Sequence, residues 1–286
     1  MLKQRVITAA IGLPLLVGGL LLGPASAVYA FLLVCSSLAV YEIAQLIFPP
    51  CFKLIESQDS VQAAPPFTQL TLFCVIMAAL VFLSATLGLG QAKVGGITAV
   101  LSLMMLMATF SGSSIPRSVI QVSGSVLSIC YGCLPWLCIW DLYLLGAHSR
   151  YLLLLLVVVM MGDSGAYFAG LKFGRYKLAP RYSPKKTWEG LLGGLLSSVG
   201  GCLLLNLIYG GELGPWWLLC SIALLAGIAG SLGDLVESAF KRFAQVKDSG
   251  AIFPGHGGFL DRVDALLFAA PVVWLLVYSY HKVASL

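Results

Sequence analysis

Long hydrophobic runs, each followed by a short polar segment, succeed one another along this chain of 286 residues. A helix needs about 20 apolar residues to cross the hydrocarbon core of a bilayer, and runs near that length recur about nine times. The pattern predicts an all-α, polytopic integral membrane protein with about nine transmembrane helices. We place them at residues 6–23, 26–48, 67–88, 94–110, 118–140, 150–171, 189–209, 215–236 and 265–281.

The first run admits a second interpretation. Lys3 and Arg5 precede it and Ala-Ser-Ala follows at 25–27, an arrangement that resembles a secretory signal and its cleavage site. The run is longer than the core of a typical signal peptide, and another hydrophobic run follows at once. We therefore favour a first membrane helix that is retained.

Composition and charge support a membrane protein and suggest its orientation. The chain is 59% hydrophobic and 10% charged, with a mean hydropathy of +0.95, which excludes an ordinary soluble domain. With a cytoplasmic N-terminus, Lys93, Arg150 and Lys282 fall outside, and the other 14 of the 17 Lys and Arg residues fall inside. This bias predicts a multi-pass protein of the plasma or inner membrane, if bacterial, with its active site on the cytoplasmic side.

Charged residues gather in the second half of the chain. Residues 150–264 hold 11 of the 17 basic and 8 of the 12 acidic residues. We interpret 1–149 as an N-terminal transmembrane scaffold and 150–286 as a C-terminal transmembrane catalytic region. Its cytoplasmic loops are predicted at 172–188 and 237–264.

The first of these loops contains Ser-Pro-Lys-Lys-Thr-Trp-Glu-Gly at 183–190. A loop that only fixes membrane orientation would explain its positive charge. Adjacent lysines beside hydroxyl groups and the amides of a helix start could equally hold a polyphosphate. These residues alone leave both interpretations open.

Acidic residues flank the second loop. Asp234 and Glu237 end the eighth run, and Asp261 and Asp264 lie one helical turn apart where the ninth begins. Both helix ends are predicted at the same membrane surface, so these carboxylates can face one another and share a divalent metal. A salt-bridged helix start is the structural alternative.

Asp163 lies inside the sixth hydrophobic run, among small residues. A carboxylate within a membrane span costs free energy and indicates a functional site. A hydrogen bond between helices is the alternative.

Four ordered motifs resemble one enzyme family. Ser238 to Asp264 spells S-x-F-K-R-x4-K-D-x-G-x2-F-P-G-H-G-G-x2-D-R-x-D, and 162–170, 183–190 and 233–238 match further segments. Together they resemble the phosphatidate cytidylyltransferases, the CDP-diacylglycerol synthases. The resemblance covers the chain from about residue 160 to its end and implies a Mg²⁺-dependent transfer from CTP to phosphatidic acid, giving CDP-diacylglycerol and pyrophosphate.

The expected partners are CTP, phosphatidic acid and the lipid bilayer, with no nucleic acid; the resemblance alone suggests a homodimer. The expected catalytic residues are Asp234, Lys241, Asp261 and Asp264. The expected metal ligands are Asp234, Asp261 and Asp264, with Asp163 and Glu237 as further candidates. The expected substrate-binding residues are Ser183, Lys185, Lys186, Lys241, Arg242, Lys247, His256, Gly257, Gly258 and Arg262. His256 is not expected to act as a base, because the attacking phosphate is already largely ionised at neutral pH.

Two other functions remain to be weighed. A transporter also carries charges within its spans, but its charges should surround a site near the membrane midplane. A CTP-dependent kinase of a lipid alcohol such as a polyprenol would use the same nucleotide, but it would need a base. The motif set favours the cytidylyltransferase over both.

Overall fold

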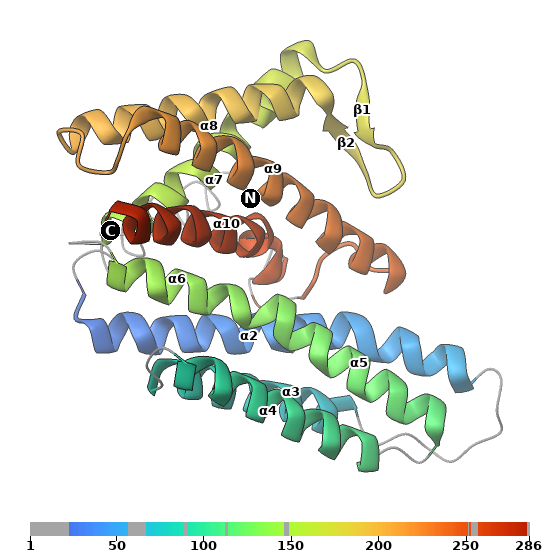
Figure 1. Ribbon diagram of the computed structural model, residues 1–286. Helices are drawn as coiled ribbons and strands as arrows, with labels where there is room; N and C mark the ends of the chain where they lie inside the picture. Colours follow the sequence, from blue (N-terminus) through green and yellow to red (C-terminus); the bar gives the residue numbers. More distant parts are fainter. Residues whose placement is uncertain are drawn as a thin grey trace. The chain divides into compact units, whose positions relative to one another are not determined.

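The computed structural model of the chain describes residues 23–56, 67–87, 91–111, 114–145, 149–250, 252 and 257–284. Within these residues the structure is almost entirely helical (Figure 1). The elements are α2 (Ala25–Glu56), α3 (Phe67–Leu87), α4 (Gln91–Ser111), α5 (Ile115–Gly132), α6 (Leu134–Leu145), α7 (Arg150–Phe173), β1 (Lys177–Ala179), β2 (Ser183–Thr187), α8 (Trp188–Ile208), α9 (Trp216–Phe243) and α10 (Leu260–Ala284).

The expected all-α polytopic architecture is confirmed, although the count of nine spans is not. Seven stretches among the described residues are long and apolar enough to cross a membrane. The run at 94–110 lies within α4, whose apolar stretch, Val94–Thr109, is shorter than these seven. The run at 6–23, and with it the choice between a signal and a retained helix, lies outside the described residues.

The run at 118–140 forms two helices in place of one. Proline at position 135 has no N–H to donate, and its ring would clash with the carbonyl four residues earlier in a continuous helix. The chain therefore ends α5 at Gly132 and begins α6 at Leu134. The amide of Trp136 donates to the carbonyl of Cys133 over 3.1 Å, a tighter turn that bridges the break.

The described helices divide between two compact units. The C-terminal unit is built mainly from Cys138–Ser238 and Val263–Leu286, and the N-terminal unit from Ala30–Leu137 and Ala239–Arg262. Ala239–Arg262 contains nearly all of the motif from Ser238 to Asp264, which we call the signature loop, so this loop belongs mainly to the N-terminal unit. The predicted division into a scaffold at 1–149 and a catalytic region at 150–286 concerns function, not compactness, and it stays a prediction.

The N-terminal unit packs α2 through α5 into a bundle. Helix α4 lies against α3 and α5. Helices α2 and α5 approach closely where α5 carries glycine: a Cβ at Gly132 would lie 2.8 Å from the backbone nitrogen of Val40. The core of the unit includes the buried side chains of Ile43, Phe48 and Phe82.

In the C-terminal unit, α7 and α8 form the tightest helix pair. A Cβ at Gly193 would overlap the Cβ of Ala169 and lie 3.1 Å from the carbonyl oxygen of Gly165. The buried hydroxyl of Ser198 donates to the carbonyl oxygen of Val158 over 2.7 Å. Small residues and interhelical hydrogen bonds are the means by which helices associate where lipid removes the hydrophobic driving force.

A two-stranded hairpin stands in the segment that was expected to be a loop. β1 and β2 pair antiparallel, with Lys177 opposite Thr187 and Ala179 opposite Ser183. Proline at position 180 suits the second position of the turn between them, which the amide of Tyr182 closes onto the carbonyl of Ala179 over 3.2 Å. The motif at 183–190 drew attention to Pro184 and the lysines, but the strand pairing was not predicted, because strands of three and five residues show too little alternation of polar and apolar positions.

Two glycines of α8 offer a matched test of the α7–α8 packing. Gly193→Ala should lower the free energy of unfolding by about 1–3 kcal/mol, because the added methyl group overlaps Ala169. Gly200→Ala, on the same helix, meets nothing within 4 Å and should leave it unchanged or raise it through its helix propensity. Thermal unfolding of both variants in the same detergent checks this. Equal melting temperatures would show that α7 and α8 do not pack as described.

Candidate functional site

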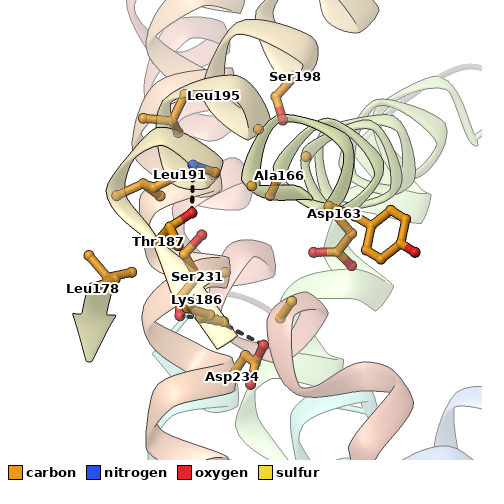
Figure 2. Close-up of a pocket in the computed structure, with 18 of the residues that line it drawn as sticks. Asp163, Ala166, Leu178, Lys186, Thr187, Leu191, Leu195, Ser198, Ser231 and Asp234 are labelled. Carbon is orange, nitrogen blue, oxygen red and sulfur yellow. Dashed lines mark hydrogen bonds and ion pairs between the residues drawn. The ribbon is translucent and has the colours of Figure 1, made fainter. Parts of the chain in front are cut away.

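Lys186 is the cation that the hairpin presents most firmly. It precedes Thr187, whose side-chain oxygen accepts a hydrogen bond from the amide of Gly190 over 3.1 Å and so caps α8. Its ammonium group lies 2.8 Å from Oδ2 of Asp234 and donates to the carbonyl oxygen of Ser231 over 2.9 Å (Figure 2). The half-buried Lys186 is therefore fixed against α9, whereas the neighbouring Lys185 is exposed.

Three carboxylates converge between α9 and α10. Asp234, Glu237 and Asp264 each offer an oxygen, and these oxygens all lie within 4.8 Å of one another. Glycines make this approach possible: a Cβ at Gly233 would lie 2.7 Å from the carbonyl oxygen of Asp264. Among the described residues, this is a group that could hold a metal ion.

The donor set suits a hard divalent cation. Three carboxylates gathered in this way repel one another, and Glu237 is only 1% exposed, so water screens little of that repulsion. The Lys186 ammonium compensates part of the charge through Asp234. A cation bound by carboxylate oxygens would compensate the rest, and such oxygens are the ligands that Mg²⁺ and Ca²⁺ prefer.

A cavity of about 650 Å³ opens beside the Lys186–Asp234 pair (Figure 2). This volume lies within the range of sites that bind small molecules. Its polar wall includes Asp163 of α7, the two residues of the pair, and Ser183, Lys185 and Thr187 of the hairpin. The rest of the wall consists of Lys177 and Leu178 of β1, Ala265 of α10 and mostly small or apolar residues of α7, α8 and α9. Asp163, singled out by its depth in a hydrophobic run, thus faces a cavity.

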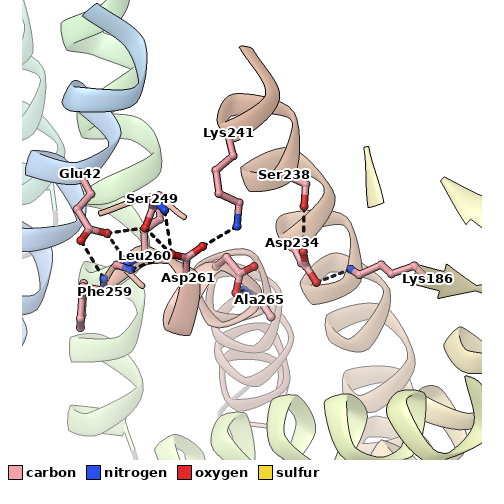
Figure 3. Close-up of polar contacts among 12 residues, drawn as sticks. Glu42, Lys186, Asp234, Ser238, Lys241, Ser249, Phe259, Leu260, Asp261 and Ala265 are labelled. Carbon is pink, nitrogen blue, oxygen red and sulfur yellow. Dashed lines mark hydrogen bonds and ion pairs between the residues drawn. The ribbon is translucent and has the colours of Figure 1, made fainter. Parts of the chain in front are cut away.

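A second polar cluster lies within the N-terminal unit, around Asp261 (Figure 3). Its Oδ1 accepts a hydrogen bond from Lys241 over 2.6 Å. Its Oδ2 accepts hydrogen bonds from the amides of Ser249 and Gly258, each over 2.9 Å. Both oxygens of Asp261 are thus engaged, and its assignment as a metal ligand stays a prediction.

The remaining expected substrate-binding residues are mostly on the surface. The side chains of Arg242, Lys247 and Arg262 are exposed, Gly257 is half-buried and Gly258 is buried. Gly257 has a φ of +84°, a backbone conformation that favours glycine. His256 lies outside the described residues.

Glu42 is a site residue that the sequence analysis missed. It lies in α2, is 1% exposed, and accepts hydrogen bonds from the amides of Phe259 and Leu260 and from the hydroxyl of Ser249. A carboxylate inside a predicted span singled out Asp163, and the same reasoning applied to 26–48 would have found Glu42. It was overlooked because the first half of the chain was interpreted as scaffold.

Comparison with known proteins gives consistent results. The sequence model of the cytidylyltransferase family matches residues 3–280. A phosphatidate cytidylyltransferase of Staphylococcus haemolyticus (strain JCSC1435) is 36% identical over 236 residues, covering 73% of this chain and 90% of the relative. Phosphatidate cytidylyltransferases of Staphylococcus saprophyticus (strain ATCC 15305) and Staphylococcus aureus (strain COL) are 41% and 39% identical over 152 and 153 residues. These two alignments each cover 53% of this chain and 57% of the relative.

The acidic cluster predicts a specific response to divalent metal. Mg²⁺ or Mn²⁺ should raise the melting temperature of the wild-type protein, because a ligand bound to the folded state stabilises it. Asp264→Asn should lose most of this increase. Without metal, the melting temperature of Asp264→Asn should stay close to that of the wild type, because asparagine keeps the size of the side chain and an acceptor oxygen for the amide of Ala265.

Glu212→Gln is the matched control. Glu212 belongs to the same unit but pairs with Arg150, away from the cluster. It should keep the full metal-induced increase. A metal response that survives Asp264→Asn, or that Glu212→Gln abolishes, would place the metal elsewhere.

Proposed function

The chain belongs to the cytidylyltransferase family, and from this premise we propose that it transfers the cytidylyl group of CTP to phosphatidic acid, giving CDP-diacylglycerol and pyrophosphate. One observation carries the proposal beyond the family. Lys186 of the hairpin and Asp234 of the acidic cluster form an ion pair in the wall of one cavity. A cation and one carboxylate of the candidate metal group therefore border the same space, an arrangement that suits chemistry on a triphosphate.

The reaction needs charge neutralisation more than proton transfer. An oxygen of the phosphatidic acid phosphate attacks the α-phosphorus of CTP, and the bond from that phosphorus to the bridging oxygen of the β-phosphate breaks. The nucleophile is a phosphate monoester whose second pKa is near 6, so it is largely ionised at neutral pH. An anion must therefore approach a polyanion, and cations that reduce this repulsion supply most of the catalysis.

The hairpin supports binding of the triphosphate. Lys185 and Lys186 follow Ser183 in β2 and line the cavity with it. Because β2 leads directly into α8, both lysines immediately precede the start of a helix, whose dipole also favours anions. We assign Lys186 to the triphosphate and Lys185 to a second phosphate contact.

The acidic cluster is assigned to Mg²⁺. Asp234, Glu237 and Asp264 would hold the ion, with Asp163 across the cavity as a further candidate. When bound, Mg²⁺ supplies positive charge to phosphate oxygens and keeps coordination positions open for them. Lys186 remains within reach of Asp234 and orients that carboxylate.

The apolar part of the cavity wall fits a lipid substrate. Leu178, Leu191 and Leu195 line it, together with small residues of α7 and α9. Phosphatidic acid joins an ionic headgroup to hydrocarbon chains, so a cavity with one charged and one apolar wall within a membrane protein matches both of its parts.

We place this site on the cytoplasmic side of the membrane. The support is the excess of Lys and Arg in the loops that the topology assigns to that side. The hairpin lies before α8 and Gly211 lies after it. The length of α8, about 30 Å, therefore separates the hairpin from Gly211 and places the two at opposite membrane surfaces in this topology.

Accessibility of introduced cysteines tests the orientation. Lys185→Cys should react with a membrane-impermeant reagent only from the cytoplasmic side, and Gly211→Cys only from the opposite side. The measurement compares intact cells with inverted vesicles of the same cysteine-free background. Labelling of position 185 from outside the cell would contradict a cytoplasmic site.

The position of a radioactive label in CTP tests the reaction itself. Full-length protein is incubated with phosphatidic acid, Mg²⁺ and CTP labelled at the α- or the γ-phosphate. A cytidylyltransferase moves the α-label into lipid and releases the γ-label as pyrophosphate. A kinase of a lipid alcohol would leave phosphatidic acid unlabelled and would move the γ-label into a polyprenol supplied in its place, and a transporter would consume no CTP.

Lys186→Met should lower kcat/KM in this assay by roughly 10- to 150-fold, the effect of losing a charge-assisted contact of about 1.5–3 kcal/mol. Arg181→Met removes an exposed cation from the same hairpin, outside the cavity wall, and should change kcat/KM less than twofold. Equal losses in the two variants would mean that the hairpin acts only through its overall charge.

A further inference from the structure

Glu42 accepts hydrogen bonds from two separate parts of the signature loop, Ser249 and the pair Phe259–Leu260. Its Oε2 accepts hydrogen bonds from the hydroxyl of Ser249 over 2.8 Å and from the amide of Leu260 over 2.7 Å. Its Oε1 accepts a hydrogen bond from the amide of Phe259 over 2.9 Å (Figure 3). One side chain of α2 thus joins two points more than 200 residues further along the chain.

The local structure is built around this carboxylate. Phe259 and Leu260 lie at the start of α10, where the first amides of a helix have no carbonyl partner within it. Glu42 accepts from both of these amides, and the positive end of the helix dipole favours its charge. Because Glu42 is 1% exposed, these contacts replace hydration that the carboxylate lost on burial.

Glycines of the loop make room for Glu42. A Cβ on Gly258 would lie 2.5 Å from its Oε2, and one on Gly250 would overlap its Oε1. Gly258 was expected to bind substrate. The structure shows that the space beside its Cα is already occupied by Glu42 and by the hydroxyl of Ser249.

Polar contacts connect Glu42 to Lys241 through the side chains of Ser249 and Asp261. The hydroxyl of Ser249 lies 2.8 Å from Glu42 and 3.1 Å from Oδ2 of Asp261. A hydroxyl has one proton, so it can donate to one carboxylate at a time, and the amide of Ser249 secures Asp261 independently. The other oxygen of Asp261 receives the ammonium of Lys241 over 2.6 Å.

We propose that Glu42 is a positioning residue for catalysis: it fixes Ser249 and the start of α10, and through them the Asp261–Lys241 pair. This proposal rests on the proposed function and on the expectation from the sequence that Lys241 and Asp261 are catalytic residues of the transfer reaction. Glu42 itself touches neither Asp261 nor Lys241 in the described hydrogen bonds, so it acts through the segment that it holds.

Glu42→Gln tests the proposal because it keeps the size of the side chain and removes one acceptor oxygen and the charge. Amide hydrogen exchange of residues 257–262 should become faster, since the amides of Phe259 and Leu260 lose an acceptor. In the α-label assay, kcat per folded molecule should fall by roughly 10- to 100-fold, the order of loss that misplaced catalytic groups produce. The KM for CTP should change less than threefold.

Gln45→Ala is the matched control on the same helix. Gln45 lies one turn after Glu42 and donates to Thr71 of α3 over 3.4 Å, not to the loop. Its loss should leave both the exchange of residues 257–262 and kcat unchanged, even if the melting temperature falls. Ser249→Ala supplies a second variant that does not alter α2.

Combining Glu42→Gln with Ser249→Ala distinguishes positioning from general destabilisation. If both act on one segment, the double variant should lose much less activity than the product of the two single losses. Unchanged exchange, unchanged kcat per folded molecule, or independent losses that multiply would each overturn the proposal. If the wild-type protein forms no CDP-lipid, the proposed function fails and the catalytic role falls with it. The exchange comparison then still decides whether Glu42 holds the segment.

Discussion

The close approach of α9 and α10 is the constraint on which the candidate site depends. A Cβ at Gly230 would lie 3.2 Å from the carbonyl oxygen of Ala265, and one at Gly233 would lie 2.8 Å from the ring of Phe268. Larger residues at these positions would separate the helices and with them Asp234, Glu237 and Asp264. The same approach that creates the cluster also creates repulsion among its carboxylates, which cations must offset. The proposed metal binding would thus be a consequence of helix packing.

The two clusters accommodate negative charge in different ways. The negative charge of Asp234 is balanced by the ammonium group of Lys186, a side-chain donor. Asp234 also accepts a weak hydrogen bond of 3.3 Å from the hydroxyl of Ser238. Glu42 instead receives backbone amides, and Asp261 receives two amides as well as Lys241. Backbone donors cannot move without moving the chain, so they fix a carboxylate in place. The ammonium group of Lys186 can move from Asp234 to a phosphate oxygen by side-chain rotation, which suits a residue that binds a substrate.

The sequence predicted the parts of this structure that depend on local pattern. Hydrophobic runs located α2, α3 and α7 to α10, because a membrane-spanning helix needs a minimum apolar length. The convergence of Asp234 and Asp264 also followed from the order of the runs, which brings the end of one helix and the start of the next to one membrane surface. The break at residues 132–134 could have been predicted from the proline that follows it.

What the sequence could not show depends on contacts between distant segments. No spacing rule links Glu42 to Leu260, since their contact spans 218 residues. The same limit applies to Gly258, whose need for a small residue is set by a side chain of α2. Pattern identifies a glycine in a signature, but only the fold shows whether a ligand or another side chain occupies the space beside it.

The hairpin shows how a short surface element can be precise enough to serve a site. The amide of Trp188 donates to the carbonyl of Tyr176 over 3.0 Å, which ties the first residue of α8 to the chain entering β1. Glu189 accepts from the amide of Tyr176 over 3.2 Å, and Thr187 caps the helix. Lys186 is therefore anchored to the start of α8, which small residues hold against α7. The backbone that carries Lys186 is thus held rigidly, although the lysine side chain itself is flexible. A rigid backbone allows the ammonium group to be positioned at Asp234 before the substrate binds.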